Sequence, residues 1–150
     1  MQNEEKKLAD LLTPIHDLGS GLYIGNKSGA YDAELLRSLD IQHMIKCDTT
    51  TKPDTVDGIY TIVVPIGDKP DTDLLKWLPL CMARISLAKL RDENILVHCD
   101  AGCSRSASIV IAWFMKSTNV DYDTALTRLQ SVRSCVSPNV GFEATLRSWA

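Results

Sequence analysis

Cys99 and Arg105 are the two residues whose types and spacing most directly suggest chemistry. They lie in residues 97–106, which read VHCDAGCSRS. A cysteine thiolate is a nucleophile, and the planar guanidinium of an arginine can hold two oxygens of an oxyanion at once. Gly102 lets the backbone curve closely around an anion, because no side chain stands in the way. The segment therefore predicts a nucleophile set inside an oxyanion cradle.

The flanking residues predict the elements that position this cradle. Residues 94–98 are an apolar run typical of a buried strand, and residues 104–118 are expected to form a helix. A loop that joins a strand to a helix aims backbone N–H groups, and the positive end of the helix dipole, at one point. The residues expected to bind a phosphate there are Asp100, Ala101, Gly102, Cys103, Ser104 and Arg105.

Metal binding by His98, Cys99 and Cys103 is an alternative interpretation of the same segment. A tetrahedral zinc site needs a second pair of ligands, which the sequence does not supply at suitable spacing. We therefore expect no metal and no cofactor. A single cysteine is most often inert core and a single arginine a solvated charge, but the full set of residues between a strand and a helix favours catalysis.

An oxygen that leaves a phosphoryl group needs a proton, so a carboxylic acid is expected on a neighbouring loop. Asp68 comes two residues after the β-branched run 59–66, which predicts a strand. Asp71 and Asp73 are rivals, but they stand at the start of a helix expected over residues 71–90, where capping and the helix dipole explain them. Asp68 is therefore our candidate for the acid.

The pattern H-C-x-x-G-x-x-R-S at residues 98–106 resembles the signature of the cysteine-dependent protein phosphatases. Softer matches are the first-strand motif at 21–26, the next strand at 41–45 and R-x-x-x-x-P-N-x-G-F at 133–142. Together they cover most of the chain, whose size is similar to that of the small stand-alone (atypical) dual-specificity members. The resemblance implies metal-independent hydrolysis of phosphotyrosine and of phosphoserine or phosphothreonine through a cysteinyl-phosphate intermediate.

Specific roles follow from this resemblance. Cys99 would attack the phosphorus, and Arg105 would hold the equatorial oxygens together with the loop amides. Ser106 would donate a hydrogen bond to the Cys99 sulfur and help the thiolate leave. His98 would order the loop from behind and help keep the thiolate charged, and Asn139 would be a supporting residue. The position of Asp68 matches the general acid of the family.

Two positions depart from the family's pattern. Lys46 stands at a strand end where many relatives carry asparagine, which leaves the local hydrogen bonding open. Asp100 lies where members that act on phosphoinositides often carry basic residues. An acidic mouth disfavours polyanionic substrates, so an enzyme acting on inositol phospholipids or RNA 5′ ends is a weaker alternative.

Other classes of protein share parts of this pattern. A non-catalytic phosphate-binding or scaffold protein is the main rival, but such relatives typically lack the nucleophile, and this chain keeps Cys99, Arg105 and Asp68. A rhodanese-like enzyme also has a cysteine–arginine loop, but Asp68, Gly102 and Ser106 favour the phosphatase. In the low-molecular-weight phosphatases the cysteine lies near the N-terminus, which excludes them.

Redox control of Cys99 is a further hypothesis. A reachable thiolate is the group that peroxide oxidises first, and a nearby thiol can capture the sulfenic acid. Cys103 lies on the same tightly curved loop, so its disulfide would deform the cradle. In the sheet that the resemblance implies, Cys47 ends a strand that lies beside residues 94–98, and the spacing of about 4.8 Å between neighbouring strands suits a disulfide. The alternative, that Cys47 is a small buried apolar residue, stays open.

A chain of 150 residues is long enough for a single core. The alternation of strands with helical segments predicts an α/β fold, with a central, largely parallel sheet of four to five strands flanked by helices. Residues 1–18 are expected to be an N-terminal lead-in, frayed or weakly helical at first, and residues 19–150 the catalytic domain. The expected strands are 21–25, 41–47, 59–66 and 94–98. The expected helices are 28–39, 71–90, 104–118, 121–134 and one after 137–139.

The net charge and the cysteine content limit the classes of partner and the cellular compartment that we expect. The net charge of −3 offers no electrostatic reason to bind nucleic acid or an anionic membrane. We therefore expect a phosphorylated protein as the substrate and a monomer as the working unit. Five cysteines without paired spacing, behind a polar start, favour a reducing compartment. We expect the cytoplasm, with the nucleus as a second location.

Overall fold

A mixed sheet lies at the centre of the fold. The structure is a computed structural model that describes residues 2–49 and 56–149. Within these residues five strands pair in the order β1-β2-β5-β3-β4, all in parallel except β1 with β2. The strands are β1 (Ile15–Asp17), β2 (Leu22–Gly25), β3 (Ile41–Cys47), β4 (Tyr60–Val64) and β5 (Asn94–His98). The largely parallel sheet is confirmed, whereas β1 was not predicted because its three residues carry too short a pattern.

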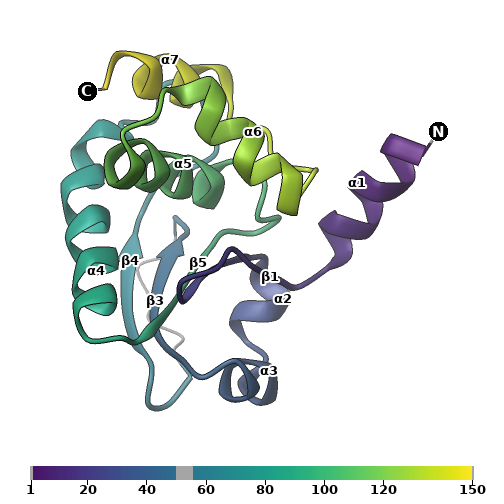
Figure 1. Cartoon of the computed structure of the whole chain (residues 1–150), viewed down its shortest axis with the longest axis vertical. Helices are drawn as coiled ribbons and strands as arrows, with labels where there is room; N and C mark the ends of the chain where they lie inside the picture. The colour runs from purple at the N-terminus through teal and green to yellow at the C-terminus, as the bar shows by residue number, and fades with distance from the viewer. Residues whose placement is uncertain (1, 50–55, 150) are drawn as a thin grey trace.

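Helices cover both faces of the sheet (Figure 1). One layer holds α4 (Leu78–Leu90), α5 (Arg105–Thr118), α6 (Tyr122–Val132) and α7 (Val140–Ser148). The other holds the short helices α2 (Lys27–Ala30) and α3 (Ala33–Ser38). Because β5 is the central strand and leads directly into α5, the segment with Cys99 lies at the carboxyl edge of the sheet, where α/β folds place their ligands.

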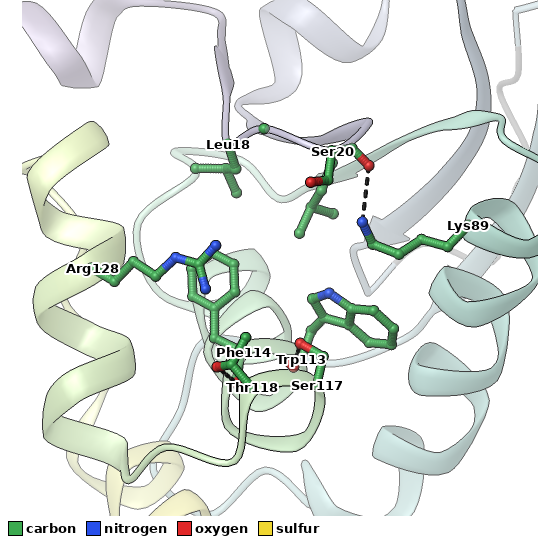
Figure 2. Close-up of a pocket in the computed structure, with 10 residues that line it drawn as sticks. Leu18, Ser20, Lys89, Trp113, Phe114, Ser117, Thr118 and Arg128 are labelled. Carbon is green, nitrogen blue, oxygen red and sulfur yellow. Dashed lines mark hydrogen bonds between the residues drawn. The ribbon is translucent and has the colours of Figure 1, made fainter.

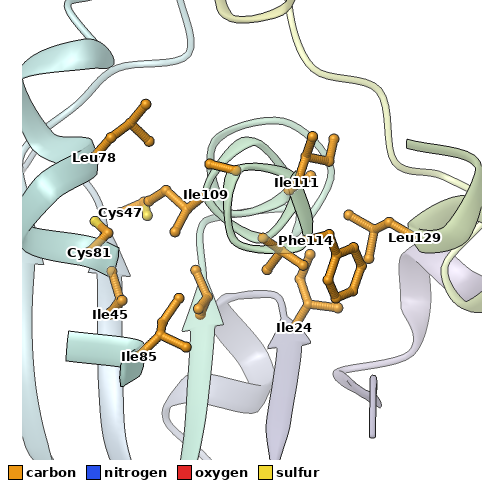
Figure 3. Packing of buried hydrophobic residues seen from close by; sticks show 14 of the residues in the cluster. Ile24, Ile45, Cys47, Leu78, Cys81, Ile85, Ile109, Ile111, Phe114 and Leu129 are labelled. Carbon is orange, nitrogen blue, oxygen red and sulfur yellow. The ribbon is translucent and has the colours of Figure 1, made fainter. Parts of the chain in front are cut away.

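Alternate side chains of the strands fill two separate cores. Ile24 and Ile45 belong to the larger cluster, which packs against α4 and α5, as Figure 3 shows. Their chain neighbours Tyr23 and Met44 belong to a smaller cluster with residues of α2 and α3. This alternation follows from the two-residue period of a strand and fixes the sheet between its two helical layers.

Two expected helices differ from the structure. The helix expected over 28–39 is two short helices, because Asp32 caps a new one by accepting a hydrogen bond from the Leu35 amide at 3.1 Å. The helix expected over 71–90 starts later, with a 3-10 turn η1 (Leu75–Trp77) followed by α4. Pro79 stands in the first turn of α4, a position that suits its fixed φ and missing N–H.

The N-terminal residues form a regular helix, α1 (Gln2–Leu12), that extends away from the body of the fold (Figure 1). Asp10, near its end, is buried and contacts Ser134 after α6. The polar segment 48–58 joins the two expected strands 41–47 and 59–66, and its residues 50–55 lie outside the described residues. None of the helices in the described part of the chain is long and apolar enough to cross a membrane.

Candidate active site

Cys99 begins the loop that joins β5 to α5. Its side chain is almost completely buried, with 3% of its surface exposed. The sulfur lies 3.1 Å from the Ser106 hydroxyl, and the Gly102 amide donates a hydrogen bond to it at 3.2 Å. Hydrogen-bond donors around a sulfur stabilise a thiolate and thereby increase its availability for attack. The structure thus brings Cys99, Gly102 and Ser106 together.

Gly102 makes the curvature of this loop possible. Its φ of +70° lies in the left-handed region that L side chains rarely adopt. A Cβ atom at this position would lie 2.7 Å from the Gly25 carbonyl oxygen and 2.8 Å from the Arg133 guanidinium. Both the backbone conformation and the space therefore require a glycine.

Arg105 lies at the start of α5 with its guanidinium near the mouth of the loop. One nitrogen donates to the Ile66 carbonyl at 3.3 Å, and another lies 3.4 Å from a carboxylate oxygen of Asp100. The Asp100 side chain is largely exposed. Because the Asp100 carboxylate is exposed, solvent weakens this ion pair, and Asp100 can release the guanidinium to an incoming oxyanion.

Asp68 reaches the same loop from the segment after β4. One carboxylate oxygen accepts hydrogen bonds from the Ser104 hydroxyl at 2.6 Å and from the Asn139 side-chain amide at 2.9 Å. Asn139 also caps α7, since its side-chain oxygen accepts from the Phe142 amide at 2.9 Å. The predicted acid and the predicted supporting residue are therefore in direct contact.

The rival carboxylates have other surroundings. Asp73 accepts a hydrogen bond from the Lys76 amide at 3.2 Å. This is the capping role that the sequence predicts for it in place of the role of general acid.

Gly141 allows the start of α7 to pack on the segment that carries Asp68, because a Cβ there would lie only 1.9 Å from the Pro70 carbonyl oxygen. The loop with Asp68 is thus held against both α5 and α7.

His98 and Lys46 are buried behind the loop on adjacent strands. Burial lowers the pKa of His98 to about 4, so its imidazole is neutral at physiological pH. A neutral imidazole acts on the loop through packing, not through a positive charge. The sequence left open which group Lys46 bonds to at the position where many relatives carry asparagine. In the structure its ammonium donates a hydrogen bond to the Tyr31 hydroxyl at 2.7 Å.

Comparisons with known proteins identify the family. The family described as "Dual specificity phosphatase, catalytic domain" matches residues 22–150. Dual specificity protein phosphatase 22 of Homo sapiens is 36% identical over 129 residues, which are 86% of this chain and 70% of that protein. The chain belongs to the dual-specificity phosphatase family. Dual specificity protein phosphatase 19 of Mus musculus is 35% identical over 128 residues, covering 85% of this chain and 58% of that protein.

Solved structures agree with this membership. The crystal structure of DUSP15 has a TM-score of 0.87 at 31% identity and covers 91% of this chain and 88% of its own. A mouse dual specificity phosphatase complexed with zinc tungstate has a TM-score of 0.83 at 31% identity, covering 89% and 84%. The human tyrosine phosphatase-like serine/threonine/tyrosine-interacting protein has a TM-score of 0.82 at 29% identity, covering 89% and 93%. The chain is therefore a small, atypical member of the dual-specificity phosphatases.

Cys47 lies in the core of this dual-specificity phosphatase, beside Cys81 on α4 (Figure 3). The parallel register pairs Lys46 with His98, so Cys47 and Cys99 are the next residues along two adjacent strands. This is the neighbourhood on which its candidate redox role depends. Burial raises the pKa of Cys47 well above its usual value, which keeps it a thiol.

Arg133 is a site residue whose role the sequence reasoning missed. Its side chain is fully buried and donates to the carbonyls of Gly102 and Ala101 in the catalytic loop, at 2.9 and 2.8 Å. It also donates to the Thr13 carbonyl at 2.8 Å and lies 2.9 Å from the His16 ring. In the sequence, the signal for Arg133 was its position as the first residue of the motif R-x-x-x-x-P-N-x-G-F at 133–142. Only the structure shows that its side chain links the catalytic loop to the N-terminal segment.

Arg133→Lys is expected to destabilise the fold by about 3 kcal/mol and to lower kcat, because one ammonium cannot satisfy carbonyls on both sides of the buried guanidinium. Urea unfolding and turnover of an aryl phosphate measure the two effects. Arg147→Lys is the matched control, since Arg147 makes exposed ion pairs with Asp123 and Glu143 and lies over the Tyr122 ring, with no contact to the loop among the described residues. Equal stability of the two variants would contradict the role given to Arg133.

A pocket lies away from this loop. Its volume is about 240 Å³. Figure 2 shows it between Lys89 of α4, the end of α5 and Arg128 of α6. Lys89 donates to the Ser20 carbonyl at 2.9 Å, and the Arg128 guanidinium lies over the Phe114 ring at 4.0 Å. Its lining residues include no cysteine, histidine or carboxylate that could act as a nucleophile or acid. The candidate active site is therefore the Cys99 loop.

Proposed function

We propose that this chain is a protein phosphatase that hydrolyses phosphate monoesters of tyrosine and of serine or threonine in phosphorylated proteins. The family membership supports this substrate class. The observation that carries the proposal is the arrangement of the loop. The Cys99 sulfur, the Ser106 hydroxyl and the Gly102 amide converge, while Arg105 and Asp68 approach from its rim.

In the first step the Cys99 thiolate attacks the phosphorus of the bound monoester. A sulfur–phosphorus bond forms as the bond from phosphorus to the substrate oxygen breaks. The Arg105 guanidinium and the loop amides hold the three equatorial oxygens, where they stabilise the transition state more than the ground state. Asp68 gives its proton to the departing alkoxide or phenoxide.

In the second step water hydrolyses the cysteinyl phosphate. Asp68, now a carboxylate, takes a proton from the water as its oxygen attacks the phosphorus. The sulfur–phosphorus bond breaks and its electron pair returns to Cys99, which the Ser106 hydroxyl stabilises from 3.1 Å. Inorganic phosphate leaves and the thiolate is restored. Asn139 and Ser104 position Asp68 through both steps, and His98 supports the loop from below.

The charges around the loop favour a monoester in a protein over a polyanion. Asp100 is exposed at the mouth and pairs with Arg105, so a ligand with several phosphates meets an acidic side chain. Together with the net charge of −3, this supports phosphoprotein substrates over nucleic acid or inositol phospholipid. We further propose a monomer in a reducing compartment, the cytoplasm or nucleus, which fits the free state of all five cysteines.

Binding without catalysis is the second candidate function. It is favoured by the similarity in fold to a protein whose name describes it as tyrosine phosphatase-like and interacting. Cys99, Arg105 and Asp68 together distinguish a catalyst from a pure phosphate binder. The two functions differ in turnover, which an experiment can measure directly.

The deciding experiment presents phosphotyrosine, phosphothreonine and phosphoserine peptides, a phosphoinositide and an RNA 5′-triphosphate to the protein in buffer with a chelator. We expect phosphate release from the peptides and much less from the two polyanions. Binding of the peptides without release of phosphate would instead support the scaffold function. Faster release from a phosphoinositide than from any peptide would contradict the substrate class.

A further inference from the structure

Cys103 and Cys135 form a thiol pair that the catalytic mechanism does not use. Cys103 lies in the phosphate loop, and Cys135 lies in the connection between α6 and α7. Their sulfur atoms are 3.0 Å apart, with the Cys103 thiol donating. Both side chains are partly exposed, so a small oxidant can reach them. A disulfide bond needs the sulfurs at about 2 Å, a small movement from where they stand.

The backbone around the pair is already fastened in this arrangement. The Ser137 amide donates to the Cys103 carbonyl at 2.7 Å, directly beside the two sulfurs. On the other side of Cys135, the amide of Ser134 donates to the Asp10 carboxylate, also at 2.7 Å. Closing a disulfide therefore joins two segments that the fold holds in register, and the loop backbone keeps its curvature.

The two thiols differ in reactivity. The hydrogen bond from Cys103 lowers the pKa of Cys135 to about 7 and raises that of Cys103. Cys135 is therefore the member of the pair that carries a thiolate at neutral pH, and a thiolate is the form that attacks peroxides. Cys103 remains protonated beside it, in position to resolve the product.

We propose that Cys103 and Cys135 are an oxidisable dithiol that reacts with hydroperoxides and closes to a reversible disulfide between the phosphate loop and the α6–α7 connection, without the participation of Cys99. The Cys135 thiolate attacks the terminal oxygen of the hydroperoxide, whose O–O bond breaks, and this leaves a sulfenic acid and hydroxide from hydrogen peroxide, or an alkoxide from an organic hydroperoxide. The Cys103 sulfur then attacks the sulfenic sulfur, and the hydroxyl group departs with the Cys103 proton as water. The peroxide is reduced by two electrons and the two thiols are oxidised.

The disulfide acts as a staple on the phosphate loop. It adds a covalent link to the contacts that Arg133 and Ser137 already make with the loop. Because the linked residues need little movement, the oxyanion cradle persists in the oxidised protein. This consequence rests on the proposed function of the loop, whereas formation of the disulfide does not.

Peptide mapping after treatment with dilute hydrogen peroxide tests the proposal. Remaining thiols are alkylated at acidic pH before digestion, so that disulfides do not exchange. We expect a thiol-reversible Cys103–Cys135 crosslink in the wild type and equally in Cys99→Ser. Cys135→Ser should lose it, and the control Cys81→Ser should keep it, because Cys81 is buried in the core away from the pair. In reduced buffer Cys135→Ser should turn over like the wild type.

A crosslink that disappears in Cys99→Ser would overturn the proposal, because oxidation would then pass through the nucleophile. Free Cys103 and Cys135 in samples whose Cys99 is oxidised would overturn it as well. Thermal unfolding gives an independent readout in the Cys99→Ser background. The oxidised form should have a Tm higher by about 5–10 °C and bind tungstate with the affinity of the reduced form. An unchanged Tm, or lost tungstate binding, would contradict the staple. Failure of the protein to release phosphate from any substrate would leave the crosslink intact and would count only against the proposed function.

Discussion

Cys99→Ser is expected to lower turnover by at least about 10⁴-fold, because a serine hydroxyl is almost fully protonated at neutral pH and cannot replace the thiolate. Affinity for an oxyanion should persist, since the Ile66 carbonyl holds the Arg105 guanidinium and Arg133 holds the loop backbone, and neither contact involves the sulfur. Phosphate release from an aryl phosphate measures the first effect, and titration with tungstate measures the second.

The matched control is Cys135→Ser, which changes a cysteine close to the same loop but outside the attacking position. It should keep the wild-type rate under reducing conditions. Wild-type turnover should be inhibited by vanadate and unaffected by a metal chelator. A Cys99→Ser protein that retains substantial activity, or a wild type that loses activity with the chelator, would contradict the mechanism.

Asp68→Ala is expected to lower kcat by about 10²–10⁴-fold on substrates with poor leaving groups, the usual contribution of general acid catalysis. The loss should shrink for activated aryl phosphates, whose leaving oxygen needs less help from a proton. A series of aryl phosphates of graded leaving-group pKa measures this dependence. Asp68→Asn is the second variant, because its side-chain oxygen can still accept hydrogen bonds from Ser104 and Asn139. It should retain the fold and show the same dependence on the leaving group.

Asp71→Ala and Asp73→Ala are the controls for this assignment. Asp73 caps the turn before α4, so its replacement should affect stability slightly and leave kcat unchanged. An Asp71→Ala variant as impaired as Asp68→Ala would show that the acid has been assigned wrongly. A uniform loss across all leaving groups in Asp68→Ala would indicate that Asp68 only positions the loop.

The parts of the site that are local in the chain could be predicted from the sequence. Cys99, Gly102, Arg105 and Ser106 lie within a single turn from a strand into a helix, so their spacing alone places them around one point. The strand before them and the helix after them follow from their apolar runs. The same locality explains why β5 and α5 are close to their expected bounds.

Contacts between distant segments could not be predicted in this way. Asp68, Ser104 and Asn139 come from three segments, and only the packing of α7 against the Pro70 loop brings their side chains together. Arginine is ordinarily a surface residue, and the residues next to Arg133 in the sequence do not indicate that its side chain is fully buried. The contact between Cys103 and Cys135 likewise depends on where the α6–α7 connection passes the loop.

The residues at which helices start and end could not be predicted from the sequence either. Asp32 and Pro79 interrupt apolar patterns that would otherwise continue, and each begins a new helix by supplying a cap or a suitable first turn. A periodic pattern of apolar residues shows which face is buried, but such single residues decide where the hydrogen-bonded turns start.

The central claim is that Cys99 carries the phosphoryl group during turnover. Rapid acid quench of the Asp68→Ala protein during hydrolysis of an activated aryl phosphate, followed by peptide mass spectrometry, tests it most directly. The activated leaving group allows the first step without an acid, whereas hydrolysis of the intermediate is slowed, so the intermediate accumulates. The account predicts one phosphoryl group on the peptide that contains Cys99, and none in the Cys99→Ser protein. Phosphate release with no phosphorylated Cys99 at any quench time, or a phosphoryl group on another residue, would contradict it.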